Sequence, residues 1–194
     1  MRHAQITRES KEAQVQVTLN LDGTGQYQTK TGLNFLDHLL GAWSFHSKFD
    51  LDLRAKGDVE VDDHHLVEDV GLALGQAVRQ ALGDVTGLVR FGWAYAPMDE
   101  ALARAVVDVS NRPFLFMSVP LARPLIGDVS AEMFPEFFRA LTTEGRITLH
   151  LEALYGSNDH HKLEAAFKAC GLALKMAVEK STTISGVPST KGVL

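Results

Sequence analysis

A motif of histidines and carboxylates occurs twice in the sequence and constrains the fold more than any other feature. Residues 63–68 read Asp-His-His-Leu-Val-Glu, and residues 159–164 read Asp-His-His-Lys-Leu-Glu. We call these the first and second cassettes. The similarity continues beyond them, because eight of the twenty aligned positions in 63–82 and 159–178 are identical, where about one match is expected from average residue usage. The chain is therefore predicted to contain an internal duplication.

The duplication predicts two halves of similar fold, residues 1–89 and 90–194, which together form one compact catalytic unit. Each half is expected to run strand, strand, helix, strand, helix. We therefore expect an α+β fold of two β-β-α-β-α halves, with antiparallel sheets and helices on one face. The expected strands are 13–21, 27–31, 48–54, 100–109, 114–119 and 146–153, and the expected helices are 34–43, 64–82, 130–143 and 160–179.

Local signals support these elements. The alternation of apolar residues in 13–21 is typical of a half-buried strand. Asp22-Gly23 then predicts a hairpin turn into the next strand. Asn34 is a suitable N-cap for the first helix, and Gly83 lies where the C-cap of the second would fall.

The composition is that of an ordinary globular protein. The 194 residues carry a formal net charge of -5 and give a pI of about 5.9, so no global field favours nucleic acid or an anionic membrane. No apolar run has the length of a signal peptide or a membrane span. The single cysteine, Cys170, excludes an internal disulfide. We expect a soluble cytoplasmic protein with no nucleic-acid or membrane partner.

The spacing within each cassette suits a metal site. On a helix, residues three and four apart share one face, so Glu68 can point to the same side of the first turn as His64 and His65. Asp63 lies where an N-cap carboxylate can accept backbone N–H groups. A single histidine pair would be compatible with a charged helix cap, but a duplicated pair with the glutamate in register favours metal binding. The second cassette repeats the arrangement with His160, His161 and Glu164.

Two further histidines lie outside the cassettes. His38 falls on the first expected helix, where its repeat partner is Phe137, and His150 falls on a strand, where its repeat partner is Asp52. Each is equally compatible with a metal ligand and with an ordinary side chain. Counting both gives four protein ligands for each of two ions. Imidazole and carboxylate without thiolate suit Mn, Fe or Zn, and positions left open for water or substrate favour Mn(II) or Fe(II) over zinc, which usually takes four ligands.

Several short stretches along the chain form a specific set. They are 35–40 (Phe-Leu-Asp-His-Leu-Leu), 62–69 (Asp-Asp-His-His-Leu-Val-Glu-Asp), 97–101 (Pro-Met-Asp-Glu-Ala), 111–113 (Asn-Arg-Pro), 160–165 (His-His-Lys-Leu-Glu-Ala) and 189–192 (Ser-Thr-Lys-Gly). With these motifs, in this order, the chain resembles the imidazoleglycerol-phosphate dehydratase family of histidine biosynthesis. Its length is similar to that of the monofunctional members.

The resemblance implies dehydration of D-erythro-imidazole-glycerol phosphate to imidazole-acetol phosphate. It implies a fold similar to the second domain of ribosomal protein S5. It also implies a homo-oligomer of twenty-four subunits built from trimers, with active sites between subunits. Each active site would hold two Mn(II) ions, with Fe or Zn as substitutes. The implied ligands are His38, His64, His65, Glu68, His150, His160, His161 and Glu164.

The resemblance also implies which residues handle the substrate. Glu12, Glu68 and Glu164 are the candidate catalytic carboxylates. We favour Glu12 for proton transfer, although an exposed charge at a strand edge would explain it equally well. Asp99 and Glu100 would contact the glycerol hydroxyls or merely flank a strand. Basic and hydroxyl groups would bind the phosphate. The substrate-binding candidates are Glu12, Arg90, Asp99, Arg112, Lys175, Ser189 and Lys191.

The expected mechanism uses the substrate's own imidazole ring, because the proton to be removed is barely acidic. Metal ions on the ring nitrogens would favour a metal-bound imidazolate. The hydroxyl on the carbon attached to the ring could then leave and give a diazafulvene. Loss of the neighbouring proton would give an enol, which tautomerises to the ketone.

Two other functions fit the cassettes. A di-metal hydrolase would use them to activate water on a phosphate ester, and a metal-storage protein would use them only to hold ions. The Ser-Thr-Lys-Gly stretch near the C-terminus argues against storage, which needs no phosphate pocket. Hydrolase and dehydratase differ in their product, free phosphate in one case and a ketone in the other.

Overall fold

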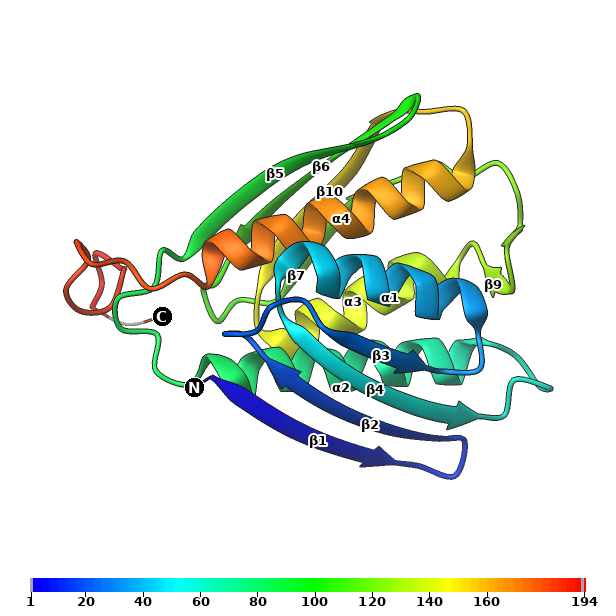
Figure 1. The fold of residues 1–194 in the computed structure, drawn as a ribbon, viewed down its shortest axis with the longest axis horizontal. Helices are drawn as coiled ribbons and strands as arrows, with labels where there is room; N and C mark the ends of the chain where they lie inside the picture. The colour runs from blue at the N-terminus through cyan, green and yellow to red at the C-terminus, as the bar shows by residue number, and fades with distance from the viewer. Residues whose placement is uncertain (1, 193) are drawn as a thin grey trace.

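Two sheets enclose a layer of helices in the computed structural model, which describes residues 2–192 and 194 (Figure 1). In this part of the chain each of the two large sheets has four strands, and four helices lie between them. The strands are β1 (His3–Glu9), β2 (Ala13–Asn20), β3 (Tyr27–Lys30), β4 (Asp50–Gly57), β5 (Phe91–Met98), β6 (Ala101–Asp108), β7 (Phe114–Ser118), β8 (Leu125–Ile126), β9 (Val129–Ser130) and β10 (Thr148–Tyr155). The helices are α1 (Asn34–Ser47), α2 (His64–Leu82), α3 (Met133–Gly145) and α4 (Asp159–Ala177).

The two large sheets share one topology. Their strand orders are β1-β2-β4-β3 and β5-β6-β10-β7, and β8 and β9 form a separate hairpin. The edge strands β3 and β7 pair in parallel with β4 and β10, while the remaining pairs in both sheets are antiparallel. The predicted α+β fold with two similar halves and mainly antiparallel sheets is therefore confirmed.

The predicted hairpin between β2 and β3 is wrong, because β4 lies between these two strands. The chain after Asp22 crosses the end of the sheet instead of turning back beside β2. Asp50, the first residue of β4, fixes this crossing by accepting the backbone N–H groups of Thr24, Gly25 and Gln26 at 2.8–3.1 Å. A turn signal is local, whereas the pairing of β3 depends on where β4 returns.

Each half begins with a strand that the sequence analysis did not predict. β1 is a mostly polar edge strand in which Ala4 is buried, so it shows little apolar alternation. β5 inverts the usual pattern, because its small residues face the core while Trp93 and Tyr95 are exposed. At Gly92 a Cβ atom would lie 1.9 Å from the carbonyl oxygen of Ala173, so only glycine allows α4 to pack this closely.

The helix layer joins the two halves, because α2 packs against α3 and α4 packs against α1. Gly75 and Gly171, which are equivalent in the repeat, lie at these two contacts. A Cβ atom at Gly75 would be 2.5 Å from the carbonyl oxygen of Leu141, and one at Gly171 would be 2.6 Å from that of Trp43. The repeated glycine therefore marks where each long helix meets a helix of the other half.

The helix starts differ in detail from the prediction. Leu33, not Asn34, is the N-cap of α1. Asp63 is the N-cap of α2 as expected, but its carboxylate makes no bond to its own helix and accepts the backbone N–H of Ser130 at 2.6 Å. The helix predicted from residue 130 begins at Met133, because Ser130 belongs to β9.

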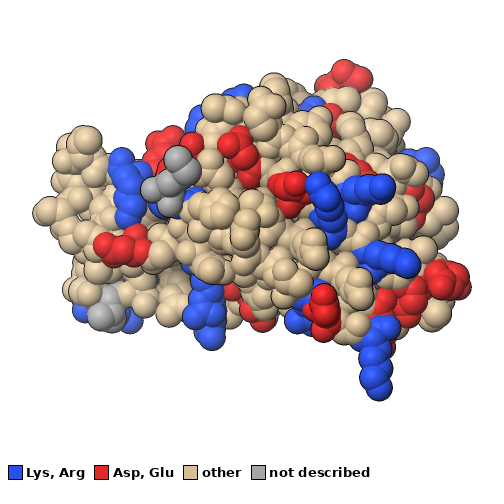
Figure 2. All heavy atoms as spheres, turned by 60° about the horizontal axis from the view of Figure 1, so that its bottom comes forward, with Lys and Arg blue, Asp and Glu red and all other residues tan. Residues whose placement is uncertain are grey.

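The surface carries mixed charge. On the face shown in Figure 2, lysines and arginines are interspersed with aspartates and glutamates, so this face presents no extended patch of one sign. In the described part of the chain, no helix combines the length and apolar character needed to cross a membrane.

Candidate metal centre

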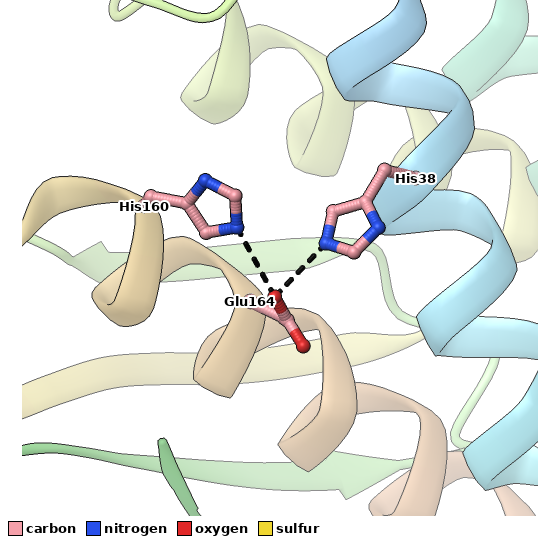
Figure 3. A group of neighbouring side chains, drawn as sticks. All are labelled: His38, His160 and Glu164. Carbon is pink, nitrogen blue, oxygen red and sulfur yellow. Dashed lines mark hydrogen bonds and ion pairs between the residues drawn. The ribbon is translucent and has the colours of Figure 1, made fainter. Parts of the chain in front are cut away.

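Three side chains from two helices meet where the two halves of the chain pack together. His38 comes from α1, and His160 and Glu164 come from α4 (Figure 3). The Nε2 atom of His38 lies 2.9 Å from Oε2 of Glu164, and Nε2 of His160 lies 3.2 Å from the same oxygen. One ligand atom of each residue lies within 4.8 Å of the others. This arrangement of two imidazoles and one carboxylate can hold a metal ion.

Helix geometry explains the group. His160 and Glu164 are four residues apart on α4 and so share one face, and the contact of α4 with α1 brings His38 beside them. The ring of Phe35, one turn before His38, lies 4.9 Å from the ring of His160 and 6.2 Å from that of His38, measured between centroids. An apolar wall therefore limits how far the two imidazoles can move.

Glu164 is the charged centre of this group. Burial alone would raise the pKa of its carboxyl, but hydrogen bonds from Lys168 and His38 outweigh burial and lower the pKa to about 2. Nζ of Lys168 lies 2.6 Å from Oε1 of Glu164. Glu164 is therefore ionised at neutral pH and offers a negative oxygen to a cation. Lys168 was not among the residues predicted from the sequence, although its position one turn after Glu164 on α4 is a signal for such a pair.

The first cassette lies apart from this group. Nε2 of His64 is 3.8 Å from the carboxylate of Glu68, as their spacing on α2 predicts. His65 points elsewhere: its Nδ1 lies 3.2 Å from the carboxylate of Asp58, and its Nε2 lies 3.9 Å from that of Glu12. The hydrogen bond that the His65 ring donates to the Asp58 carboxylate raises the pKa of His65. Glu12, the candidate for proton transfer, therefore lies beside an expected metal ligand.

His161 of the second cassette also pairs with carboxylates. Its Nδ1 is 2.7 Å from Oε2 of Glu100, and its Nε2 is 3.9 Å from the carboxylate of Asp99. This contact raises the pKa of His161 and lowers the pKa of Glu100 to about 2. In both cassettes the second histidine thus has its Nδ1 beside a carboxylate, which leaves Nε2 as the atom available to a metal ion. Asp58 was not predicted from the sequence, and Glu100 was expected, with Asp99, at the glycerol hydroxyls and not beside His161.

His150 lies on the outer face of the second sheet, on β10, and not with the His38 group. It is exposed, and its ring centroid lies 5.9 Å from that of Phe114 and 5.6 Å from that of Phe116. Among the described residues, the only group of three or more close potential ligands is His38, His160 and Glu164. One chain therefore gathers part of the expected ligand set and leaves the rest dispersed.

The structure brings four of the phosphate-binding candidates together. Arg90, Arg112, Ser189 and Lys191 line one pocket of about 280 Å³. Both arginines pair with the carboxylate of Asp108, at 2.7 Å and 3.1 Å. The shared carboxylate orients the two guanidinium groups, and the remaining positive charge can attract a phosphate.

Lys175 does not line this pocket, nor does it lie with the His38 group. It occupies the last turn of α4, about three turns beyond Glu164, which is roughly 16 Å along a helix axis. Its role in phosphate binding stays a prediction.

The metal group and the phosphate pocket lie at opposite ends of α4. The helix starts at the His160 cassette and ends at Ala177, whose carbonyl oxygen accepts the backbone N–H of Arg90 at 2.9 Å. Along the helix axis, His160 and Ala177 are separated by about 25 Å.

The sequence model of the imidazoleglycerol-phosphate dehydratase family matches residues 31–174, which include both cassettes and His38. The chain belongs to this family. Imidazoleglycerol-phosphate dehydratases are hydro-lyases of histidine biosynthesis, and the chain is therefore an enzyme of that class.

Curated relatives match the chain over its full length. The imidazoleglycerol-phosphate dehydratase of an Exiguobacterium species is 52% identical over 192 residues, which cover 99% of this chain and 98% of the relative. The enzyme of Acidiphilium cryptum is 52% identical over 194 residues, covering 100% and 99%.

Solved structures of imidazoleglycerol-phosphate dehydratases have the same fold. The enzyme from Staphylococcus aureus aligns with a TM-score of 0.83 and 37% identity, covering 92% of this chain and 99% of that one. The enzyme from Pyrococcus furiosus, in complex with (S)-C348, aligns with a TM-score of 0.85 and 38% identity, covering 97% and 100%.

Proposed function

We propose that this imidazoleglycerol-phosphate dehydratase is metal-dependent and converts D-erythro-imidazole-glycerol phosphate to imidazole-acetol phosphate through a diazafulvene. The convergence of His38, His160 and Glu164 supports metal dependence most directly, because two imidazoles around one carboxylate form a donor set that divalent transition metals accept. The pocket with two arginines and a lysine suits the phosphate.

The proposed cofactor is a pair of Mn(II) ions, for which Fe or Zn could substitute. The donor set fits, because imidazole nitrogens and the ionised carboxylate of Glu164 are ligands that these metals accept. Such ions supply Lewis acidity, which favours the imidazolate form of the substrate ring. The proposed ligands are His38, His64, His65, Glu68, His150, His160, His161 and Glu164.

The protein's own carboxylates and cations are assigned to proton transfer, to charge at the ligand clusters and to substrate binding. We assign Glu12 to proton transfer at the carbon next to the one that loses hydroxide, since it lies 3.9 Å from His65, an expected ligand. Glu68 and Glu164 hold negative charge at the ligand clusters, and Lys168 fixes the second oxygen of Glu164. Asp99, beside His161, is placed to bind a glycerol hydroxyl.

The active site is proposed to form between subunits. Only a three-carbon chain separates the ring from the phosphate in the substrate, whereas about 25 Å of helix separates the two sites of one chain. The metal group of one subunit must therefore meet the phosphate pocket of another. His150 and the first cassette would likewise complete their ligand sets with residues from a neighbouring copy.

The outer face of the second sheet supports assembly. Exposed aromatic residues cover it, and an apolar sheet face of this kind is typical of a surface buried between subunits. The exposed residues are Phe91, Trp93, Tyr95, Val106, Phe114, Phe116, Leu154 and Tyr155. We propose a homo-oligomer, with twenty-four subunits built from trimers as the family resemblance implies.

A cytoplasmic location is also proposed, because a phosphorylated biosynthetic intermediate is retained inside the cell. The mixed charge in Figure 2 gives no support to nucleic-acid binding on that face.

Substitution of a ligand tests the proposal. We expect His160→Ala to lose bound Mn(II) and to lower turnover by more than a hundredfold, since outer-shell changes alone cost about 10–100-fold. Inductively coupled plasma mass spectrometry measures the metal content. Turnover is measured as formation of the ketone, which is detected as its enolate in alkali. His3→Ala, which removes an exposed histidine of β1, is the control and should keep both. Full turnover by metal-stripped wild-type protein would contradict metal dependence, and release of free phosphate would favour the hydrolase instead.

A further inference from the structure

One segment of the chain touches all three helices that carry the expected helical ligands. It comprises residues 120–131, between β7 and α3, and includes the β8–β9 hairpin; we call it the strap. Figure 1 places β9 at the end of the molecule where α1, α2 and α4 begin. No residue of the strap is among the expected ligands or substrate contacts.

The strap is bound to α4 through a buried carboxylate. Asp159, the residue before His160, is 3% exposed, and its Oδ2 atom accepts the backbone N–H groups of Ala122 and Arg123 at 3.0 and 2.9 Å. Its Oδ1 atom forms an ion pair of 2.8 Å with Lys162, which also donates to the carbonyl oxygen of Pro120. The first turn of α4 therefore cannot shift without breaking bonds to the strap.

The strap is bound to α1 through Asp128. The two oxygens of this carboxylate accept the backbone N–H of Asn34 at 2.6 Å and that of Phe35 at 2.9 Å. These N–H groups belong to the first turn of α1, which has no side-chain cap from its own N-cap residue. Asp128 thus caps α1 from the other half of the chain.

The turn of the strap also packs against the metal group. Gly127 has φ +63°, and a Cβ atom there would lie 2.6 Å from Cβ of Phe35. The ring of Phe35 in turn lies against His38 and His160. A continuous line of contact therefore runs from the strap to both imidazoles.

The third attachment is to α2. The backbone N–H of Ser130 donates to Asp63 at 2.6 Å, immediately before His64. The aspartate that opens each cassette therefore accepts backbone N–H groups from the strap and none from its own helix. The first residue of both cassettes thus has the same role, which is to attach the strap to the start of a ligand helix.

We propose that the strap sets the relative positions of the three ligand helices, and that Asp128 is a positioning residue that holds His38 in place for metal binding. Asp128 touches neither ion nor substrate in this scheme. It acts by fixing the start of α1, one turn before His38. The proposal rests on the metal-dependent function proposed above.

The test measures the affinity of the full-length apoprotein for Mn(II) by calorimetric titration. Asp128→Ala should weaken binding about tenfold or more, as outer-shell changes do. Asp128→Asn keeps one acceptor oxygen and should give an intermediate loss, which also provides a reading if the alanine variant does not fold. Circular dichroism checks that each variant is folded.

Asp50→Ala is the matched control. Asp50 also accepts backbone N–H groups, from Thr24, Gly25 and Gln26, but it lies beyond the other end of α1. The Asp50→Ala variant should be less stable than the wild type and should keep the wild-type affinity for Mn(II). Equal affinity in wild type and Asp128→Ala, or an equal loss in Asp50→Ala, would overturn the strap proposal alone. Absence of Mn(II) binding by the wild type would overturn the proposed metal function and, with it, this role for Asp128.

Discussion

Carboxylates that accept backbone N–H groups recur at the turns of this structure. Asp50 is the clearest case outside the site, because its carboxylate holds the crossing that follows β2. Burial would raise its pKa, but the hydrogen bonds from Thr24, Gln26, Asn20 and Gly25 together lower it below its usual value. The folded state therefore stabilises the ionised carboxylate of Asp50 more than the unfolded chain does.

Asp50→Ala should destabilise the protein most at neutral pH. A depressed pKa contributes stability that is present above the unfolded-state value of about 3.9 and is lost as the pH falls through the folded-state value. We expect a loss of about 1–2 kcal/mol at pH 7 and a smaller difference from wild type near pH 3. Thermal unfolding of both proteins across this range is the measurement. A difference that does not shrink at low pH would contradict the role assigned to the carboxylate.

At the residue scale, the sequence pointed to the expected ligands more readily than to the residues that contact them. The cassettes were recognisable because duplication singled them out. Asp58 was not recognisable, because it contacts His65 only after the chain has folded. Glu100 was expected at the glycerol hydroxyls and lies beside His161 instead. Lys168 was overlooked because its spacing from Glu164 is that of an ordinary helical ion pair. Arg90 and Lys191, far apart in sequence, were grouped by resemblance, and the structure places them in one pocket.

At the element scale, the repeated glycine decides how the helices pair. Gly171 lets α4 approach α1 closely enough for His38 to reach Glu164, whereas Gly75 serves the α2–α3 contact. Small residues at such crossings permit a short interaxial distance.

Gly171→Ala should therefore disturb both stability and the metal group. Overpacking a close contact costs about 1–3 kcal/mol, which exceeds the gain of about 1 kcal/mol from alanine in a helix. We expect a lower melting temperature and weaker Mn(II) binding. Gly75→Ala is the comparison, because it should lower the melting temperature but change Mn(II) affinity less. The same affinity in both variants would show that the α1–α4 contact has no special bearing on the site.

Most elements were predictable from periodicity, and α2 was predicted residue for residue. The failures have physical causes. β1 lacks apolar alternation, β5 turns its aromatic side outward, and the position of β3 depends on a strand that follows later. The separation of the chain at residues 89 and 90 stays a prediction, and the helix layer that links the halves favours a single unit.

At the scale of the whole molecule, the distance between the metal group and the phosphate pocket matters most. The candidate metal ligands His160 and Glu164 lie near the start of α4, and the candidate phosphate pocket lies beyond its end. Sequence motifs could name the residues at each end. The motifs could not show that the two groups of residues lie far apart within one chain, because this distance depends on how α4 runs in the folded structure.

Mixing two inactive variants tests whether neighbouring chains share a site. His160→Ala removes a metal ligand, and Arg112→Ala removes a phosphate contact. Co-expressed in equal amounts, they should assemble together and regain up to about a quarter of wild-type turnover, because only sites with one intact part from each chain would work. Turnover of the purified mixed assembly is compared with that of each variant alone. No recovery in a mixed assembly would contradict a shared site.

Because the metal ligands and the phosphate pocket lie at opposite ends of α4, catalysis should begin only after subunits assemble. A newly synthesised chain would fold completely and still be inert towards its substrate until it met its neighbours. Diluting the protein should then switch off turnover before any helix melts, so that the concentration of subunits, and not their folding, sets the onset of activity.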